Sequence, residues 1–447
     1  MSTAAAASAL ARDLAGIVGE ANTCDDPKLL GAMAIDGVVP RIAVSPGSPQ
    51  EVAAVLRLAW KDGLVIVPAG GFTHQGTGAI PPEVDIVVRS TRLTAVEHYD
   101  PGDLTVGVGA GTTLGQLDQM VAANRQMLPL DTAHADTATV GGILAVNAEG
   151  PLKHAFGGVR DYCIGVRFAT ADGKLAKGGG RVVKNVAGYD MMKLLIGSYG
   201  TLGVIVGASF KLFPRPQQTR TFICSFAGAA GALQFRDRIQ RSPLAPMCLE
   251  VVSPRAHVVL GGEANGPDAE AWRLLLRAGG SDAILNRYRK ELGAAVTREV
   301  DGDAEASLWR HYAEFAEAAV ARSHNAMLVA VHIPAQSAEA VIAAAQQAAL
   351  DNNFVCAVTG RIGIGSLLIA FMPVAVDPPG AVLYVNAMSA FRGALPRDGS
   401  AIVLRCPLEA KRHFSVWGSS PTDLESMRAV KQALDAKDIL NRGRFLF

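Results

Sequence analysis

Four glycine-rich segments in the first half of the chain constrain its fold more than any other feature. They cover residues 68–76, 107–117, 138–151 and 184–205, and three of them adjoin an apolar, strand-like run. Glycine is used where the backbone takes a positive φ or comes close to another group. The chain has neither a GxGxxG fingerprint nor a GxxxxGK[ST] phosphate loop. Another explanation is therefore needed for what these glycines approach.

The first segment, PAGGFTHQG, follows the strand-like run Leu64–Val67 directly. A Gly-Gly turn that leaves a strand exposes consecutive backbone N–H groups, which can hold a phosphate without a basic side chain. The hydroxyl of Thr73 adds a donor. The pattern is compatible with a phosphate-binding loop and also with a plain connecting loop.

The other three segments have different interpretations. In GVGAGTTLGQL, Leu114 stands where a third fingerprint glycine is needed, so a bulge or close packing is expected. In ATVGGILAVNAEGP, Gly141-Gly142 either starts a helix or lies against a ligand, with Asn147 on the same wall. In the last segment Asp190 is expected to cap a short helix, and 203–205 begins a strand that can meet a flat ring through its backbone.

The order of the elements predicts more than one domain, as 447 residues exceed what one core usually holds. Pro214-Arg215-Pro216 is the first expected boundary. From 217 to about 410, strand-like runs alternate with alanine-rich segments, among them 268–278, that we expect to be helices. This is an α+β pattern around an antiparallel sheet.

Charge and cysteine content exclude several classes of protein. The net charge of +1 gives no argument for nucleic-acid binding. The six cysteines are isolated, so we expect neither an iron–sulfur cluster nor a metal site. The N-terminus lacks a basic region, and no apolar run approaches the about 20 residues of a spanning helix. We expect a cytoplasmic protein, or one peripheral at the inner face of the membrane.

Five motifs in order resemble the FAD-binding (PCMH-type) domain of the vanillyl-alcohol oxidase type of flavoproteins. They are PxGGxT after a strand, ATVGG with NAxGP, RDYxxGVxxxxADG, RVVKNVAGYD and GTLGVI. The combination of the last two is similar to glycolate oxidase subunits and 2-hydroxyacid dehydrogenases near them. The resemblance implies a two-subdomain FAD-binding domain (1–216), an α+β cap domain with an antiparallel sheet (217–410), and a C-terminal segment that returns to the FAD domain (411–447).

The resemblance also implies which residues contact FAD. Some relatives attach FAD through a histidine in the first loop, but Phe72 occupies that position here, so non-covalent FAD is expected. His74, two residues on, is either a solvent-facing loop residue or a cofactor contact. The implied cofactor-binding residues are Pro68, Ala69, Gly70, Gly71, Phe72, Thr73, His74, Gly76, Ala138, Thr139, Val140, Gly141, Gly142, Asn147, Gly203, Val204, Ile205, Asn441 and Arg444.

One departure from the family pattern affects the expected function. Catalytic relatives carry GHxGDGNxH in the cap domain, whereas residues 360–368 read GRIGIGSLL here. The change resembles the second flavin-binding subunit of glycolate oxidase. That subunit works with a catalytic flavoprotein subunit and an iron–sulfur subunit, and the complex oxidises a small 2-hydroxyacid. A stand-alone flavin oxidase or dehydrogenase for another hydroxy compound and a non-catalytic flavin-binding subunit are the alternatives.

Few residues are candidates for binding the substrate. Arg361 and Arg405 can each hold a carboxylate; the alternative is that they are surface or salt-bridged arginines. His324 and His332 lack metal-ligand spacing and are interpreted as structural. Lys184 and Asn185 are expected to order their loop rather than to act as acid or base. No catalytic base is assigned from the sequence.

Overall fold

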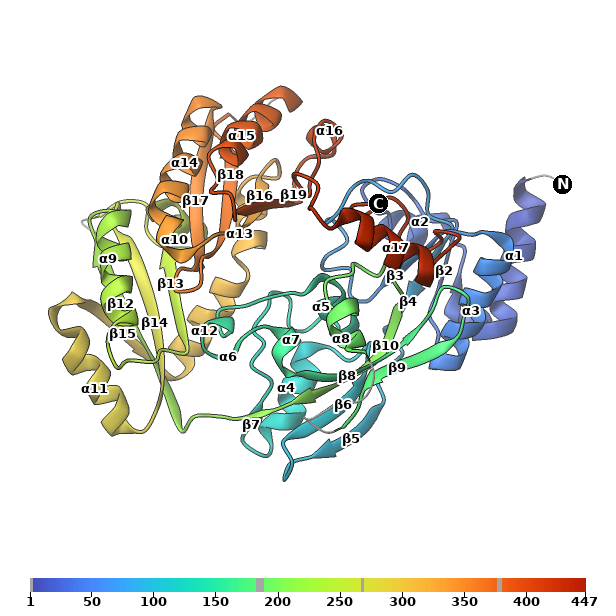
Figure 1. Ribbon diagram of the computed structural model, residues 1–447, viewed down its shortest axis with the longest axis horizontal. Coiled ribbons are helices and arrows are strands. Elements are labelled where there is room, and N and C mark those ends of the chain that lie inside the picture. The colour runs from blue at the N-terminus through green and yellow to red at the C-terminus, as the bar shows by residue number, and fades with distance from the viewer. Residues whose placement is uncertain (1–2, 182–188, 267–268, 376–379) are drawn as a thin grey trace.

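The computed structural model describes residues 3–181, 189–266, 269–375 and 380–447. Lys184 and Asn185, for which an ordering role is predicted, lie outside the described residues. Two lobes are joined side by side, and the C-terminal segment crosses back to the lobe that contains the N-terminus (Figure 1). The expected combination of a two-subdomain FAD-binding fold with an α+β cap is confirmed.

The first subdomain is a four-stranded sheet in the order β1-β2-β4-β3, in which β2, β4 and β3 are parallel. Helix α3 begins with a local capping pattern, because Ser48 accepts the N–H of Glu51 and Pro49 is the first helical residue. The elements are α1 (Thr3–Val18), β1 (Thr23–Cys24), α2 (Pro27–Ala32), β2 (Ile42–Val44), α3 (Pro49–Asp62), β3 (Ile66–Ala69) and β4 (Ile86–Arg89).

The second subdomain is an antiparallel sheet in the order β5-β6-β10-β8-β9. The glycines of β6 are there for close packing, as expected: a Cβ on Gly109 would lie 2.1 Å from the carbonyl oxygen of Leu93. The elements are β5 (Val96–Asp100), β6 (Thr105–Gly109), α4 (Leu114–Ala122), β7 (Gln126–Met127), α5 (Val140–Val146), α6 (Lys153–Phe156), α7 (Val159–Tyr162), β8 (Cys163–Ala169), β9 (Leu175–Gly179), α8 (Met191–Leu195), β10 (Val204–Lys211) and β11 (Phe213–Pro214).

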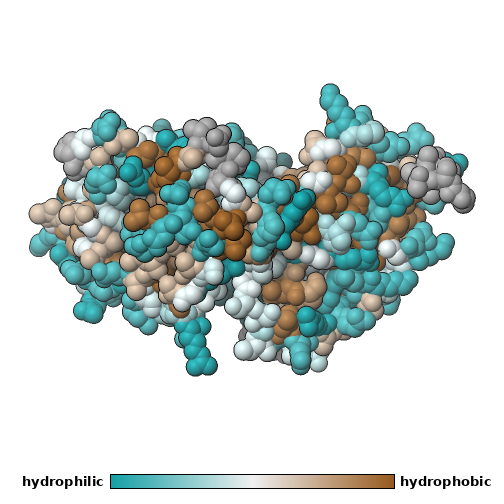
Figure 2. Space-filling model, turned by 90° about the horizontal axis from the view of Figure 1, so that it is seen from above, coloured by the Kyte–Doolittle hydropathy of each residue, from teal (hydrophilic) through white to brown (hydrophobic). Residues whose placement is uncertain are grey.

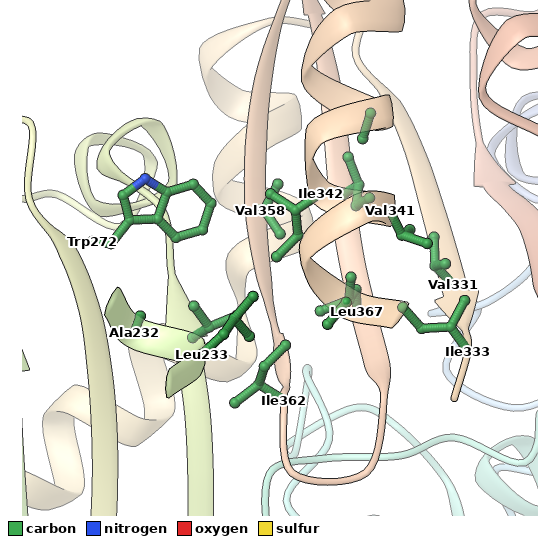
Figure 3. Packing of buried hydrophobic residues seen from close by; sticks show 14 of the residues in the cluster. Ala232, Leu233, Trp272, Val331, Ile333, Val341, Ile342, Val358, Ile362 and Leu367 are labelled. Carbon is green, nitrogen blue, oxygen red and sulfur yellow. The ribbon is translucent and has the colours of Figure 1, made fainter. Parts of the chain in front are cut away.

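The cap domain is an eight-stranded antiparallel sheet in the order β15-β12-β14-β13-β17-β18-β16-β19. Helices α9, α11, α14 and α15 bury apolar side chains on one face, and part of that core is shown in Figure 3. Helices α10, α12 and α13 pack on the other face. The strands are β12 (Gln218–Phe226), β13 (Cys248–Val252), β14 (Trp272–Gly280), β15 (Val296–Asp301), β16 (Met327–His332), β17 (Phe354–Arg361), β18 (Ser366–Pro373) and β19 (Ser400–Arg405).

The helices of the cap domain are α9 (Ala229–Gln240), α10 (Pro254–Val259), α11 (Asp282–Leu292), α12 (Gly302–Ala313), α13 (Phe315–Arg322), α14 (Ala338–Asp351) and α15 (Ala381–Gly393). Short 3₁₀ turns occupy Glu20–Asn22, Gly293–Ala295 and Ala335–Ser337. The helix predicted over 268–278 is wrong, because Trp272–Gly280 forms β14. This strand is hydrogen-bonded to β12 and β13 and has both faces covered, so its apolar run is continuous and lacks the alternation of a half-exposed strand.

The C-terminal segment contains α16 (Leu408–Lys411) and α17 (Leu424–Leu434) and ends in the FAD-binding domain. The N–H of Ile66 donates to the carbonyl of Ile439 at 2.7 Å, and the N–H of Asn441 donates to the carbonyl of Ile66 at 2.8 Å. Leu440 therefore lies as an additional parallel neighbour of β3. This pairing places 441–447 beside the loop that leaves β3.

Candidate functional site

Two adjoining hollows contain most of the residues implicated by the sequence. The first, here called the glycine pocket, lies within the FAD-binding domain and is lined by residues 68–75, Thr77, Val88, Ser90, Thr139, Gly141, Gly142, Ala145, Val146, 199–200, 203–205, Asn441 and Arg444. The second, the interdomain cavity, has a volume of about 1200 Å³ and lies where the two lobes in Figure 2 meet. The two hollows share residues 71–75, Thr77, Val146 and Tyr199, so they form one continuous site.

The loop after β3 offers a set of free backbone donors. Within the described part of the chain, no protein group accepts a hydrogen bond from the N–H groups of residues 70–76. The carbonyls of Gln75 and Thr77 accept from the Arg444 guanidinium, which also pairs with Asp36 at 2.6 Å. Unpaired N–H groups on a tight turn are a concave anion site. The phosphates of FAD therefore fit this loop.

The glycines of this loop permit a close approach to the neighbouring segment. A Cβ on Gly70 would lie 2.0 Å from the Thr139 hydroxyl, and one on Gly71 would lie 1.9 Å from the carbonyl oxygen of Thr137. Gly76 differs, because a Cβ there meets nothing within 4 Å. Gly70 and Gly71 thus bring the loop against the start of α5, and Gly76 lines the interdomain cavity instead.

The segment around α5 forms a wall of the glycine pocket. The Thr139 hydroxyl caps the helix by accepting from Gly142 at 3.3 Å, and the N–H groups of Val140 and Gly141 donate to the carbonyls of Thr112 and Ala110. The donors of the first turn are therefore already used by the protein. The two interpretations of this segment are compatible, since Gly141 and Gly142 both start a helix and line the pocket. Ala138 and Val140 are buried behind the wall.

The third side of the pocket is the start of β10. Gly203, Val204 and Ile205 line it, and the strand register shifts between Ile205 and Gly207, which is a β-bulge. The short helix α8 precedes this strand and is capped by Asp190, as expected. Gly197, which follows the helix, has a positive φ of +81°. The three residues predicted to meet a ligand through their backbone therefore lie together on this wall.

His74 lies between the two hollows and is not a solvent-facing residue. Its Nε2 atom is buried and has no hydrogen-bond partner. The pKa of His74 is lowered to about 4, mainly by burial, with the nearby His134 acting in the same direction and Glu317 in the opposite one. The imidazole is therefore neutral at pH 7, with one ring nitrogen available to a ligand. Phe72, on the same loop, takes a positive φ of 61° and faces both hollows.

The remaining predicted cofactor contacts have different roles. Asn147 ends α5 in the left-handed conformation and lines the interdomain cavity. Asn441 donates to the carbonyl of Tyr199 at 2.6 Å, while its Oδ1 is buried without a partner beside the glycine pocket. Arg444 is 4% exposed, and its guanidinium hydrogen-bonds the carbonyls of the loop. Its visible role is to hold the loop after β3.

The two candidate arginines of the cap domain line the interdomain cavity and have acidic partners. Arg361 Nη1 lies 3.5 Å from the Glu149 carboxylate and donates to the carbonyl of Gly150 at 3.2 Å. Arg405 Nη1 lies 3.4 Å from the carboxylate of Glu317. Both are therefore salt-bridged arginines that also face the cavity. Arg361 is the more enclosed, with 13% of its side chain exposed against 46% for Arg405.

His332, interpreted as structural from the sequence, lines the same cavity. It is the last residue of β16, where the apolar run MLVAV ends in a histidine. A polar residue at the end of a buried strand is a signal that could have identified it. Elsewhere in the cavity wall, Tyr199, Trp417 and Phe445 form an aromatic cluster with ring centroids 4.7 to 5.3 Å apart.

Two other kinds of feature are absent from the described residues. No group of three or more His, Cys, Asp or Glu side chains among them could hold a metal ion. Across the same residues, no helix has the length and apolar character needed to cross a membrane.

Comparison with known proteins gives two family matches. A FAD binding domain matches residues 40–179, and the C-terminal domain of FAD linked oxidases matches residues 215–388 and 410–445. A D-lactate dehydrogenase from Archaeoglobus fulgidus is 35% identical over 53% of this chain and 53% of its own length. A D-2-hydroxyglutarate dehydrogenase from Xanthomonas citri pv. viticola is 28% identical over 91% of this chain and 89% of its own.

Two further matches concern the subunit identity and the fold. Glycolate oxidase subunit GlcE from Escherichia coli is 42% identical, but over only 27% of this chain and 35% of its own length, so identity with that subunit is not supported. The solved structure of an alkyldihydroxyacetonephosphate synthase superposes with a TM-score of 0.75 at 18% identity, covering 98% of this chain and 86% of its own. At that identity the superposition shows the fold alone. The two family matches together cover most of the chain and identify it as a FAD-dependent oxidoreductase.

Proposed function

We propose that this flavoprotein oxidises a small 2-hydroxyacid to the 2-oxo acid. The observation that carries the proposal is the continuity of the two hollows: the donor loop 70–76 opens into a cavity whose far wall contains Arg361 and His332. Bound FAD supplies the acceptor for two electrons. The enclosed cationic side chain of Arg361 suits a carboxylate. Relatives named as D-lactate and D-2-hydroxyglutarate dehydrogenases support the same substrate class.

We further propose that the chain works in a complex, with a second catalytic flavoprotein subunit and an iron–sulfur subunit that takes up the electrons. Support comes from residues 360–368, where GRIGIGSLL replaces the histidine-rich motif of the catalytic relatives. The partial likeness to glycolate oxidase subunit GlcE is also in favour. The complex would lie in the cytoplasm or at the inner face of the membrane. The alternative, a stand-alone dehydrogenase, is supported by the nearly end-to-end alignment with the Xanthomonas protein.

Anaerobic spectroscopy of the purified FAD-loaded protein tests both parts. Glycolate, D-lactate and D-2-hydroxyglutarate are added in turn, and the loss of flavin absorbance near 450 nm is recorded. Bleaching by the isolated chain supports the oxidation and favours the stand-alone alternative. Bleaching that requires co-expressed partner subunits supports the complex. If none of the three acids reduces the flavin in either preparation, the proposed activity is wrong and a non-catalytic flavin subunit is favoured.

A further inference from the structure

A row of polar residues crosses the cap-domain sheet on the side of the FAD-binding domain. Strand register pairs Arg361 with Ser366, and Ser366 with His332, on the neighbouring strands β17, β18 and β16. The row continues to Ser400 on β19. Directly opposite residues of an antiparallel pair present their side chains on the same face, with Cβ atoms about 4.5–5.5 Å apart. The three side chains therefore start as close neighbours although they come from distant parts of the sequence.

The face of the sheet on which the row lies follows from the alternation along each strand. Leu368, two positions from Ser366, and Leu328, four positions from His332, belong to the same apolar cluster as Met127 and Leu152 of the FAD-binding domain. The intervening residues Val331, Val358 and Leu367 pack beneath α14 on the opposite face (Figure 3). The row is thus directed at the FAD-binding domain, and Arg361, Ser366, His332 and Ser400 all line the interdomain cavity.

Arg361 has hydrogen-bonding capacity that the protein leaves unused. Its Nη1 is held by Gly150 and Glu149, but its Nε is buried and has no hydrogen-bond partner. An unsatisfied buried donor costs about 1–3 kcal/mol, more for a charged group. A carboxylate can accept from two guanidinium N–H groups at once and would relieve this cost. Glu149, which also lines the cavity, forms a second ion pair with Lys153.

His332 can interact with the other end of a small acid. Its ring makes no hydrogen bond within the described residues, although it faces the cavity. Desolvation lowers its pKa below the ordinary value of 6.5, with Lys153 and Arg361 acting in the same direction and Glu149 in the opposite one. The imidazole is then neutral at pH 7 and has a nitrogen that can accept a proton.

We propose that Arg361, Ser366 and His332 form the binding site of the 2-hydroxyacid, with Arg361 holding the carboxylate and His332 accepting the hydroxyl proton. This inference rests on the proposed function. FAD, when bound, would take up the C2 hydrogen with its two electrons, while the hydroxyl proton would move to His332 and the product would be a 2-oxo acid. Arg405 is excluded from the row, because it pairs with Leu328, four residues before His332 on β16.

Titration calorimetry with oxalate, a small carboxylate that cannot be oxidised in this way, tests the site without relying on activity. The FAD-loaded wild-type protein should bind oxalate, and Arg361→Gln should weaken binding by roughly 10- to 100-fold. Arg361→Lys, which keeps the charge but loses the paired donors, should fall between them. The matched control is Arg405→Gln, expected to stay within about 2-fold. The flavin absorbance of each variant shows whether the fold and the cofactor are retained.

The role of His332 has a separate readout. His332→Gln should bind oxalate within a few-fold of wild type, yet lower the rate of flavin bleaching by the substrate by roughly 100-fold or more. Absence of oxalate binding in the wild-type protein, or binding that Arg361→Gln leaves unchanged, would overturn the inference even where a hydroxyacid bleaches the flavin. Oxalate binding that depends on Arg361, without bleaching by any acid, would support the anion site but refute both the role of His332 and the proposed activity.

Discussion

Two glycines of one loop differ in what a methyl group would meet, and this difference gives a sharp test of the donor loop. Gly71→Ala places a Cβ 1.9 Å from the carbonyl oxygen of Thr137, so the loop must move away from α5. Overpacking of this kind costs about 1–3 kcal/mol, and FAD binding should weaken roughly 10- to 100-fold. Gly76→Ala, where the Cβ meets nothing within 4 Å, is the matched control.

The measurement is the ratio of flavin to protein absorbance after dialysis against a series of FAD concentrations. Equal FAD affinity in Gly71→Ala and Gly76→Ala would contradict the assignment of this loop to the cofactor. The sequence alone predicted only part of this arrangement. The glycine pattern identified the loop, but the contact of Gly71 with Thr137 joins segments 66 positions apart, and no local pattern encodes it.

A second test at the residue scale concerns Glu250, which is 1% exposed on β13. Burial is the main cause that raises its pKa from 4.5 to about 8, opposed by Arg361 and by the hydrogen bond from Tyr312. The native protein then keeps a proton that the unfolded chain releases, so this group's contribution to stability is lost as the pH rises from about 4.5 to 8.

Glu250→Gln removes that pH dependence while conserving size. Relative to wild type, the variant should have a similar free energy of unfolding near pH 4.5 and gain stability towards pH 8, by at most about 5 kcal/mol. Urea unfolding at several pH values measures the difference between the two proteins. A difference that is constant across this range, or that changes in the opposite direction, would show that Glu250 is ionised in the native protein.

At the scale of elements, β14 shows where sequence patterns stop being informative. Its central position leaves no exposed face, and the run WRLLLRA lacks the alternation that marks a half-exposed strand. One polar residue of this strand, Arg277, is directed at α12, where it donates two hydrogen bonds, at 2.8 and 2.9 Å, to Glu305. That partner is 28 positions away, so its pairing is a product of the fold. By contrast, the caps at Ser48, Thr113 and Asp190 each bond the N–H group three residues further on, so a local pattern can encode them.

The same ion pair predicts how α12 is held on the sheet. Glu305 is 2% exposed and also accepts from the hydroxyls of Thr219 and Thr221, so Glu305→Gln leaves Arg277 without its counter-ion. The free energy of unfolding should fall by about 3 kcal/mol. Asp303→Asn, an exposed change in the same helical turn, should stay within about 0.5 kcal/mol. Chemical denaturation of the wild-type protein and the two variants measures these free energies of unfolding. Equal losses of stability in the two variants would contradict a buried ion pair as the cause.

At the scale of the whole molecule, the functional site is assembled from segments that the sequence separates widely. The motifs identified the donor loop and the walls at 139–142 and 203–205 individually. They did not predict that Arg361 would meet Glu149, or that Arg444 would hold the loop after β3, because these pairs are more than 200 positions apart. His332 was missed for the same reason: its importance depends on the neighbouring strands, which place it beside Ser366.

The division of the molecule into lobes predicts which of its domains FAD stabilises against unfolding. The walls of the glycine pocket come from the FAD-binding domain and the C-terminal segment, and the large core beneath α14 belongs to the cap domain alone. A ligand stabilises the unit that binds it, by about 2.7 kcal/mol at 100 times its dissociation constant. FAD should therefore raise the melting temperature of one calorimetric transition, while a transition assigned to the cap domain moves less.

Scanning calorimetry at increasing FAD concentrations measures both transitions. The assignment can be made with Trp60 in α3 and with Trp272 and Trp309 in the cap domain, whose fluorescence in single-tryptophan variants reports the unfolding of each lobe. Gly71→Ala, with its displaced loop, should show a much smaller FAD-dependent shift. A shift of the cap-domain transition alone would place FAD in the wrong lobe. Equal shifts of both would mean that the apolar contacts of Met127 and Leu152 with the cap domain make the two lobes unfold as one unit.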